Sequence, residues 1–409
     1  MSLFNNTQDR KLEDMMNKTL MATTLLSALA STAVYADSTS EDVAALQQQV
    51  DSLSSLIANL SKNTIHVSGF ASGAFAVANN DAGYAGYTTD GSYHEDSLFG
   101  VQATFKPSKS LEATIQLVAK GELDWKPKVT AAYLGYTFDN DVKLRVGKLR
   151  LPLFMLSDYL DLGYAQPWAR SPEEVYGRVP ISSFTGVDAS YEMELDDSYI
   201  NLQAFTGNEK MSDESSAGGA GNVEDIVGLV TTWNDDYWTV RASYTIATVK
   251  DVEFPIVGID ANNGKPITAL PNIESESGSY ASFGVRYENE NWLVMGEATQ
   301  TRVDGYFSDS NAGYVTVGYH LNQVMPYVSV ARLETVDNEE RESLNQAAQS
   351  LTYQRNAYSV GTRWDIQPGL AMKFDVTYAN NFGDTNGGLD PKSTEDSTTV
   401  FTIKVDATF

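Results

Sequence analysis

The chain of 409 residues is poor in several residue types on which common protein chemistry depends. It contains no cysteine, which excludes disulfides, thiolate metal sites and cysteine nucleophiles. It has three histidines, without a metal-ligand spacing or an arrangement typical of a hydrolase, so we expect no enzyme, metal or cofactor. Its 28 basic residues face 54 acidic ones, and a net charge of -26 would repel nucleic acid.

Long apolar runs are also missing, and the mean hydropathy of -0.28 argues against a helical membrane protein. The stretch from Leu20 to Val34 is too short, and too rich in Thr and Ser, for a membrane helix. With Lys18 before it and small residues at its end, residues 16–36 have the pattern of a secretory signal peptide with cleavage after Ala36. We expect residues 1–15 to be an upstream addition and the mature protein to be exported.

Residues 37–62 have apolar side chains at alternating spacings of three and four. A period of 3.5 residues is typical of a coiled coil, which predicts an oligomerisation segment of about three heptads. The alternative is one amphipathic helix lying on the following domain. The residues of the seam are Val43, Leu46, Val50, Leu53, Ile57 and Leu60.

From residue 64 to residue 409 the hydrophobic period is two, as in β-strands. The last strand shows it best, because its apolar face consists of Phe401, Ile403, Val405, Ala407 and Phe409. Such alternation occurs both in soluble β-sandwiches and in membrane barrels, since each type of strand has one wet face and one apolar face.

The lengths of the connections separate these two possibilities. Seven short polar turns, such as Asp139-Asn140-Asp141 and Gln367-Pro368-Gly369, alternate with eight longer segments, and aromatic residues gather at the strand ends. This arrangement is typical of outer-membrane barrels, and the connections imply sixteen antiparallel strands around a water-filled lumen. The longer segments are 79–96, 120–129, 148–185, 208–223, 249–278, 304–309, 335–351 and 380–396.

With these features the chain resembles the gammaproteobacterial sixteen-stranded outer-membrane porins, and among them those with an N-terminal coiled coil. The resemblance implies a homotrimer in the outer membrane, in contact with lipid and lipopolysaccharide, with its coiled coil in the periplasm. It also implies passive diffusion of small hydrophilic solutes and ions. The last strand resembles the signal that the barrel-assembly machinery reads, here Phe401, Ile403, Val405 and Phe409.

The third long segment, residues 148–185, is unusually apolar and aromatic for a loop. Standing in water it would expose a large apolar patch, so we expect it to fold against the inner barrel wall. It then resembles the constriction loop of porins, although it could instead pack on a neighbouring protomer. The charged residues that we expect at the constriction are Arg145, Arg150, Arg170 and Arg178, opposed by Asp158, Asp161, Glu173 and Glu174.

Successive side chains of a strand point to opposite faces of the sheet, and this alternation predicts which charged side chains face the lumen. If the apolar face is turned outward, the lumen wall includes Lys143, Arg241, Arg286, Arg355, Arg363 and Lys373. Arg145, Lys404 and six acidic residues share this parity, so the wall is nearly balanced in charge. With eight basic against six acidic residues, we expect the interior to favour anions mildly, while the acidic outer loops oppose anion entry. The alternative is that these charges pair with one another and hold the loop down.

A non-specific diffusion porin is therefore the favoured function. A channel selective for small anions such as dicarboxylates is the alternative, and an adhesion or structural barrel is the third possibility. Divalent cations could bridge the acidic loops to lipopolysaccharide. No Asp-rich calcium-binding loop motif is present, so the sequence predicts no specific metal site.

Overall fold

The computed structural model describes residues 65–177, 179, 181–211, 220–254, 256–259, 266–268, 273–305, 307–342, 351–385, 387–390 and 393–409. The predicted signal peptide and the heptad segment lie outside these residues. The chain divides into two compact units, one comprising Met1–Val67 and Ala103–Ser108 and the other Ser68–Gln102 and Lys109–Phe409. The side-chain contacts and cavities described below lie in the second unit.

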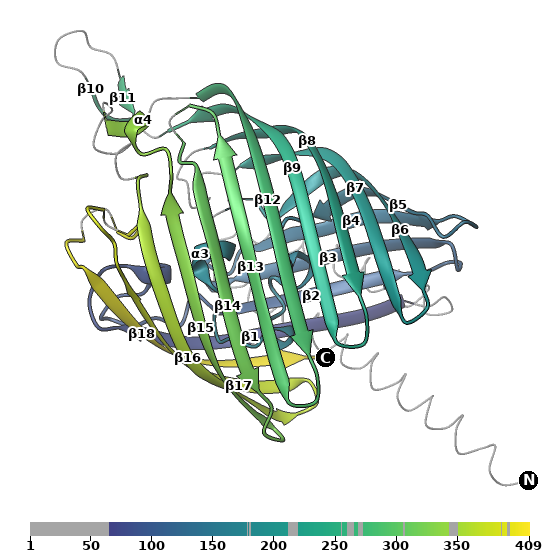
Figure 1. Ribbon diagram of the computed structural model, residues 1–409. Helices are drawn as coiled ribbons and strands as arrows, with labels where there is room; N and C mark the ends of the chain where they lie inside the picture. The colour runs from purple at the N-terminus through teal and green to yellow at the C-terminus, as the bar shows by residue number, and fades with distance from the viewer. Residues whose placement is uncertain are drawn as a thin grey trace, which may run out of the picture. The chain divides into compact units, whose positions relative to one another are not determined.

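Sixteen strands form a closed antiparallel barrel, which confirms the predicted fold class and strand number. Neighbours in the chain are neighbours in the sheet, and Figure 1 shows β12 to β15 lying side by side. The strands are β1 (Ile65–Ala78), β2 (Leu98–Phe105), β3 (Leu111–Lys120), β4 (Pro127–Thr137), β5 (Lys143–Arg150), β6 (Ser183–Leu195), β7 (Ser198–Met211), β8 (Ala220–Asn234), β9 (Trp238–Glu253), β12 (Ile273–Glu288), β13 (Trp292–Val303), β14 (Ser310–Tyr319), β15 (Val324–Thr335), β16 (Gln354–Gln367), β17 (Leu370–Asn380) and β18 (Ser397–Thr408).

Two further strands, β10 (Ile256–Ile259) and β11 (Pro266–Thr268), form a separate two-stranded sheet within the connection between β9 and β12. The helical elements within the described part of the chain are single turns. They are η2 (Tyr84–Gly86), η3 (Gly121–Leu123), η4 (Ser157–Tyr159), η5 (Gly163–Ala165), α3 (Glu173–Tyr176) and α4 (Glu339–Glu342). Among the residues that the structure describes, no helix has the length and apolar character needed to cross a membrane.

The seven short turns of the sequence are all short connections between adjacent strands. Three of them contain a residue with positive φ, namely Asp141 at 63°, Asn322 at 56° and Gly369 at 81°. Asn, Asp and Gly tolerate this left-handed conformation better than other residues, and it matches the twist of tight hairpins. Turn chemistry therefore fixes which strand ends are joined closely.

The two faces of the strands differ as the sequence predicts. On β18, Phe401 and Ile403 are 51% and 47% exposed on the outer face, whereas Thr402 and Lys404 are 2% and 6% exposed. The register of β17 and β18 places apolar side chains beside apolar ones and polar beside polar. Val376 of β17 lies opposite Phe401, and Asp375 lies opposite Thr402. The apolar face is thus outside, and the polar face of these strands lies inside the barrel.

Candidate pore constriction

The connection between β5 and β6, residues 151–182, lies inside the barrel, and we call it the inner loop. Its contacts reach strands far along the chain. The Trp168 indole donates a hydrogen bond to the Thr316 hydroxyl at 2.9 Å, and Lys373 donates to the Gly163 carbonyl at 2.7 Å. In Figure 1, α3 of this loop is seen behind β13 and β14. The prediction that this segment folds back into the barrel is confirmed.

The apolar side chains of the inner loop are buried against the wall. Leu153, Phe154 and Trp168 are at most 5% exposed. Phe154 contacts the ring of Tyr280 at a centroid distance of 5.5 Å, and Trp168 contacts that of Tyr314 at 5.4 Å. Both tyrosines belong to wall strands, β12 and β14. The apolar composition of this loop therefore serves to pack it onto the inner surface of a barrel.

Polar groups of the wall bind the backbone of the inner loop. Glu297 on β13 accepts hydrogen bonds from the Met155 amide at 2.9 Å and from the Tyr176 hydroxyl at 2.8 Å. The carbonyl of Leu153 accepts from Ser243 and Ser282, both at 2.7 Å. Because buried backbone groups are costly without partners, this pairing lets an irregular loop lie at the centre of the molecule.

The loop approaches the wall closely at Gly163. A Cβ atom at this position would lie 2.1 Å from Oδ1 of Asp406 and 2.8 Å from the Ser72 hydroxyl. Asp406 in turn forms a 2.8 Å ion pair with Lys373, which holds the Gly163 carbonyl. Only glycine fits between the loop backbone and this polar group of the wall.

Three of the four arginines predicted at the constriction are in direct contact with a carboxylate. Arg150 binds Asp161, which also accepts from Lys120 at 3.2 Å. Arg145 binds Asp188 of the neighbouring strand, with one N–O distance of 2.9 Å. The remaining contact joins Arg170 to Asp96 at 2.9 Å, with the guanidinium 4.6 Å from the centre of the Tyr87 ring.

Glu174 and Arg355 form a fully buried ion pair at 2.6 Å. Tyr84 adds a hydroxyl at 3.2 Å from the same carboxylate, and its ring lies 5.3 Å from the guanidinium carbon. Arg355 and Lys373 are 2% and 0% exposed. They therefore lie beneath the inner loop and do not line an open lumen, contrary to the expectation from strand parity alone.

The other predicted lumen residues also have partners. Lys143 lies 2.6 Å from Glu112, Arg286 binds Glu288, and Arg241 donates to the Pro152 carbonyl at 3.2 Å. Arg363 donates to the carbonyls of Tyr164 and Gln166 at 2.7 and 3.1 Å. The wall thus uses much of its basic charge to hold the loop or to neutralise adjacent acids.

Asp158 differs from the other acids of the inner loop because it is exposed and has no ion pair within 4.0 Å among the described residues. Its charge nevertheless acts on the guanidinium groups of Arg145 and Arg241. Glu173 is half-buried. Arg178, the last of the predicted set, lies outside the described residues.

Two loop carboxylates have pKa values below the ordinary range. Burial alone would raise the pKa of Asp161, but Lys120 and Arg150 outweigh it and hold the pKa well below its usual range. Burial likewise opposes ionisation of Asp96, and the charges of Arg170 and Lys404 again lower the pKa below its ordinary value. Both groups are carboxylates at neutral pH, so both ion pairs are formed there.

A cavity of about 860 Å³ lies beside the inner loop, and we call it the charged cavity. Its lining includes six basic and six acidic residues, so its formal charge is balanced. These residues are Lys120, Lys128, Lys148, Arg170, Lys210 and Lys404 with Glu95, Asp96, Glu122, Asp161, Glu173 and Glu209.

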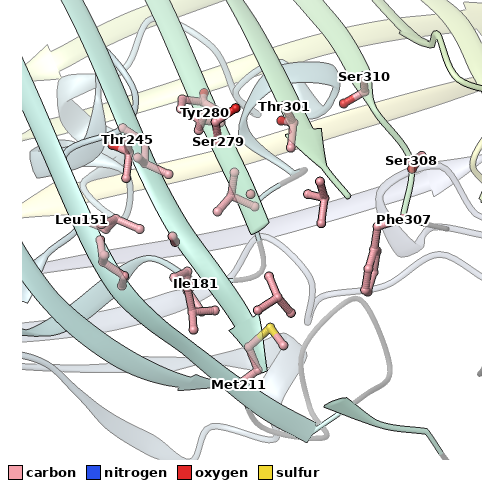
Figure 2. A pocket seen from close by; sticks show the side chains of 18 of the residues that line it. Leu151, Ile181, Met211, Thr245, Ser279, Tyr280, Thr301, Phe307, Ser308 and Ser310 are labelled. Carbon is pink, nitrogen blue, oxygen red and sulfur yellow. The ribbon is translucent and has the colours of Figure 1, made fainter. Parts of the chain in front are cut away.

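A second cavity, of about 270 Å³, contains no charged residue among the 21 that line it. We call it the apolar cavity, and Figure 2 shows the side chains around it, among them Leu151, Ile181 and Met211. Four residues line both cavities, namely Gly177, Val179, Ile181 and Met211. The sequence did not predict this cavity, although apolar residues on both faces of β8 are a signal for it.

Within the described ranges, no group of three or more His, Asp or Glu side chains is placed to hold a metal ion.

No family model matches the sequence, and no curated protein matches it. Solved structures do resemble the fold. OmpT, an outer-membrane protein of Vibrio cholerae, is 13% identical over 85% of this chain and 98% of that one, with a TM-score of 0.56. Salmonella typhi OmpF in complex with daunomycin has the same identity, coverages and TM-score. An anion-selective porin from Comamonas acidovorans is 12% identical over 85% of this chain and 100% of that one, with a TM-score of 0.53.

Proposed function

We propose that this protein is an outer-membrane porin through which small hydrophilic solutes and ions diffuse passively. The observation that carries the proposal is the charged cavity beside the inner loop, inside a closed sixteen-stranded barrel. An adhesion or structural barrel has no need of a wet, charged interior of this size. The solved structures named above share the fold, and the one from Comamonas acidovorans is an anion-selective porin by its title.

The balance of charge in the cavity supports general diffusion over strict selectivity. Lys148 and Glu209 are in contact at 2.5 Å, and Lys120 lies near both Asp161 and Glu122. Paired charges have weak far fields, so the lining favours neither ion strongly. Selectivity for small anions remains the second candidate, because Arg241 binds the Pro152 carbonyl and has no ion pair within 4.0 Å among the described residues.

Single-channel recording of the purified protein in planar bilayers tests the proposal. A general pore gives a conductance that rises in proportion to salt, with a reversal potential in a salt gradient close to that of free diffusion. A selective channel gives saturating conductance and block by its solute, for which succinate is a suitable probe. The absence of conductance would reject both and favour the adhesion or structural barrel.

The proposal includes the route to the membrane and the assembly of the protein. We infer a signal peptide that ends at Ala36, a periplasmic coiled coil over residues 37–62 and a homotrimer surrounded by lipid and lipopolysaccharide. The exposed apolar face of β18, with Phe401, Ile403 and the terminal Phe409, supports recognition by the barrel-assembly machinery. The gammaproteobacterial type belongs to the same proposal.

A further inference from the structure

The apolar cavity is unusual because it lies among inward-facing positions of the barrel. Other inward-facing positions of β9 are charged or polar, such as Arg241 and Ser243. Ala247 and Val249 continue the same face of β9 but are apolar, and Ile226 on the adjacent β8 is buried to 1%. Since β8 also presents Val227 and Leu229 outward, it is apolar on both faces here.

This cavity is separated from the charged cavity by the returning arm of the inner loop. Val179 and Ile181 line both spaces, so one wall of the apolar cavity is the loop itself. Figure 2 shows Leu151 and Ile181, from the two ends of this loop, on one side of the cavity, and Phe307 on the far side. A solute inside the barrel can therefore contact a charged surface on one side of the loop and an apolar surface on the other.

Two polar atoms at the apolar cavity point to a ligand. The hydroxyls of Thr245 and Tyr280 have no hydrogen-bond partner among the described residues, and the two side chains are 5% and 7% exposed. Thr299 lies near the Tyr280 hydroxyl without reaching it in hydrogen-bonding geometry. Buried hydroxyls without partners are unfavourable, so a bound group that donates to or accepts from them would stabilise the site.

We propose that the apolar cavity binds an uncharged, mostly apolar small molecule that carries a hydrogen-bonding group. Its size sets the scale of the ligand, since an engineered cavity of about 150 Å³ binds benzene and this one has room for about ten heavy atoms. The absence of charge from the 21 lining residues disfavours ions, because nothing would replace their hydration. The site is distinct from the charged cavity through which we propose that ions diffuse.

The probe is 1-naphthol, which is neutral at pH 7 and has eleven heavy atoms. We expect the full-length protein in lipid nanodiscs to bind it saturably at one molecule per chain in equilibrium dialysis, above the linear uptake of empty nanodiscs. The charged analogue 1-naphthalenesulfonate should not compete. Binding that only follows lipid content, or equal competition by the sulfonate, would overturn the proposal.

Gly278→Leu fills the site from β12. A Cβ at Gly278 meets no atom closer than 3.6 Å, so the new side chain enters the cavity without a backbone clash. We expect naphthol affinity to fall at least tenfold, with single-channel conductance retained as evidence that the barrel has assembled. Gly73→Leu, at an open position of β1, is the matched control and should bind like the original protein. Equal binding by both variants would overturn the site.

The second variant, Thr245→Val, keeps the shape of the side chain and removes only its hydroxyl. It should weaken naphthol binding and leave the binding of naphthalene unchanged. If it leaves naphthol binding unchanged as well, the assigned hydrogen bond is wrong.

Discussion

At the scale of single residues, the exposed acid Asp158 has a different role from its buried neighbours. Its carboxylate acts on Arg145 and Arg241 without forming an ion pair, whereas Asp161 is fully engaged by Lys120 and Arg150. A solvent-exposed charge without an ion pair influences passing ions. A charge in a close ion pair mainly stabilises the local structure. Selectivity should therefore respond to Asp158 more than to Asp161.

Asp158→Asn tests this difference. Because it removes the exposed negative charge that acts on Arg145 and Arg241, we expect the chloride-to-potassium permeability ratio to rise about twofold, equivalent to about 0.4 kcal/mol and typical of an exposed charge. The ratio follows from reversal potentials in a KCl gradient. Asp139→Asn, at an exposed short turn, should leave it unchanged. A shift toward potassium would contradict the expected role of Asp158.

Gly163→Ala tests the close approach of the inner loop to β18. Since the added methyl group would lie 2.1 Å from Asp406, the loop backbone must move away and lengthen its bond to Lys373. We expect faster cleavage of the loop in limited proteolysis and larger fluctuations of the open-channel current. Gly73→Ala, where a Cβ meets no atom within 4 Å, should behave like the original protein. Identical cleavage rates for the two variants would show that the loop is held elsewhere.

At the scale of elements, the inner loop should stay anchored over a wide range of pH. Asp161 and Asp96 have pKa values lowered by their cationic partners, so they contribute stability above the ordinary carboxylate pKa of about 3.9. This contribution is lost only as the pH falls through their lower folded-state values. We therefore expect these two ion pairs, and the proteolytic protection that they give to the loop around Asp161, to persist from pH 8 to pH 4.

The variant Asp161→Asn removes one of these anchors. It should lower the protection of the loop already at pH 7, because Lys120 and Arg150 then face each other without a carboxylate. A loss of protection in the original protein with a midpoint above pH 4 would show that another titrating group controls the loop.

The strands and the inner loop were predictable because their signals are local. Alternation along β18 identifies its outer face, and residues such as Asp141 and Asn322 mark the tight turns. The apolar content of residues 151–182 similarly predicts that this loop is buried. These features depend on side chains that are close in sequence. They can therefore be predicted from a single sequence.

The partners within the candidate site were not predictable, because they depend on where the loop crosses the barrel. Arg170 binds Asp96, 74 positions earlier, and Glu174 binds Arg355, 181 positions later. Nothing in the local sequence selects Asp96 over the other acids of its loop. Parity placed Arg355 and Lys373 inside the barrel correctly, yet it could not show that the loop covers them.

At the scale of the whole molecule, we propose that the heptad segment stabilises a trimer whose symmetry the barrel sets. Leu53→Asp places a charge in the predicted seam, so the trimer should dissociate at a lower temperature in detergent, with the barrel itself still folded. Semi-native electrophoresis over a temperature series measures this. Ser54→Asp, one position away from the seam, is the matched control. Equal dissociation temperatures would favour the alternative of a helix lying on the same chain.

The distribution of charge over the whole chain leads to a salt-dependent selectivity. Five long loops, at 79–96, 208–223, 249–278, 335–351 and 380–396, hold twenty acidic and five basic residues, whereas the charged cavity is balanced. A negative rim repels anions over a distance of about 10 Å in 0.1 M salt and about 3 Å in 1 M salt. The rim should therefore determine selectivity in dilute salt, and the interior should determine it in concentrated salt.

We expect the chloride-to-potassium permeability ratio to rise as the mean KCl concentration increases from 0.05 M to 1 M at a fixed gradient. Replacing Asp384, Asp390, Glu395 and Asp396 of the last loop by their amides should raise the ratio in dilute KCl and change little at 1 M, because the rim charge is then already screened. A potassium preference that survives both high salt and neutralisation of the loops would mean that the interior itself selects cations, and the balanced lining would then not describe the path of the ions.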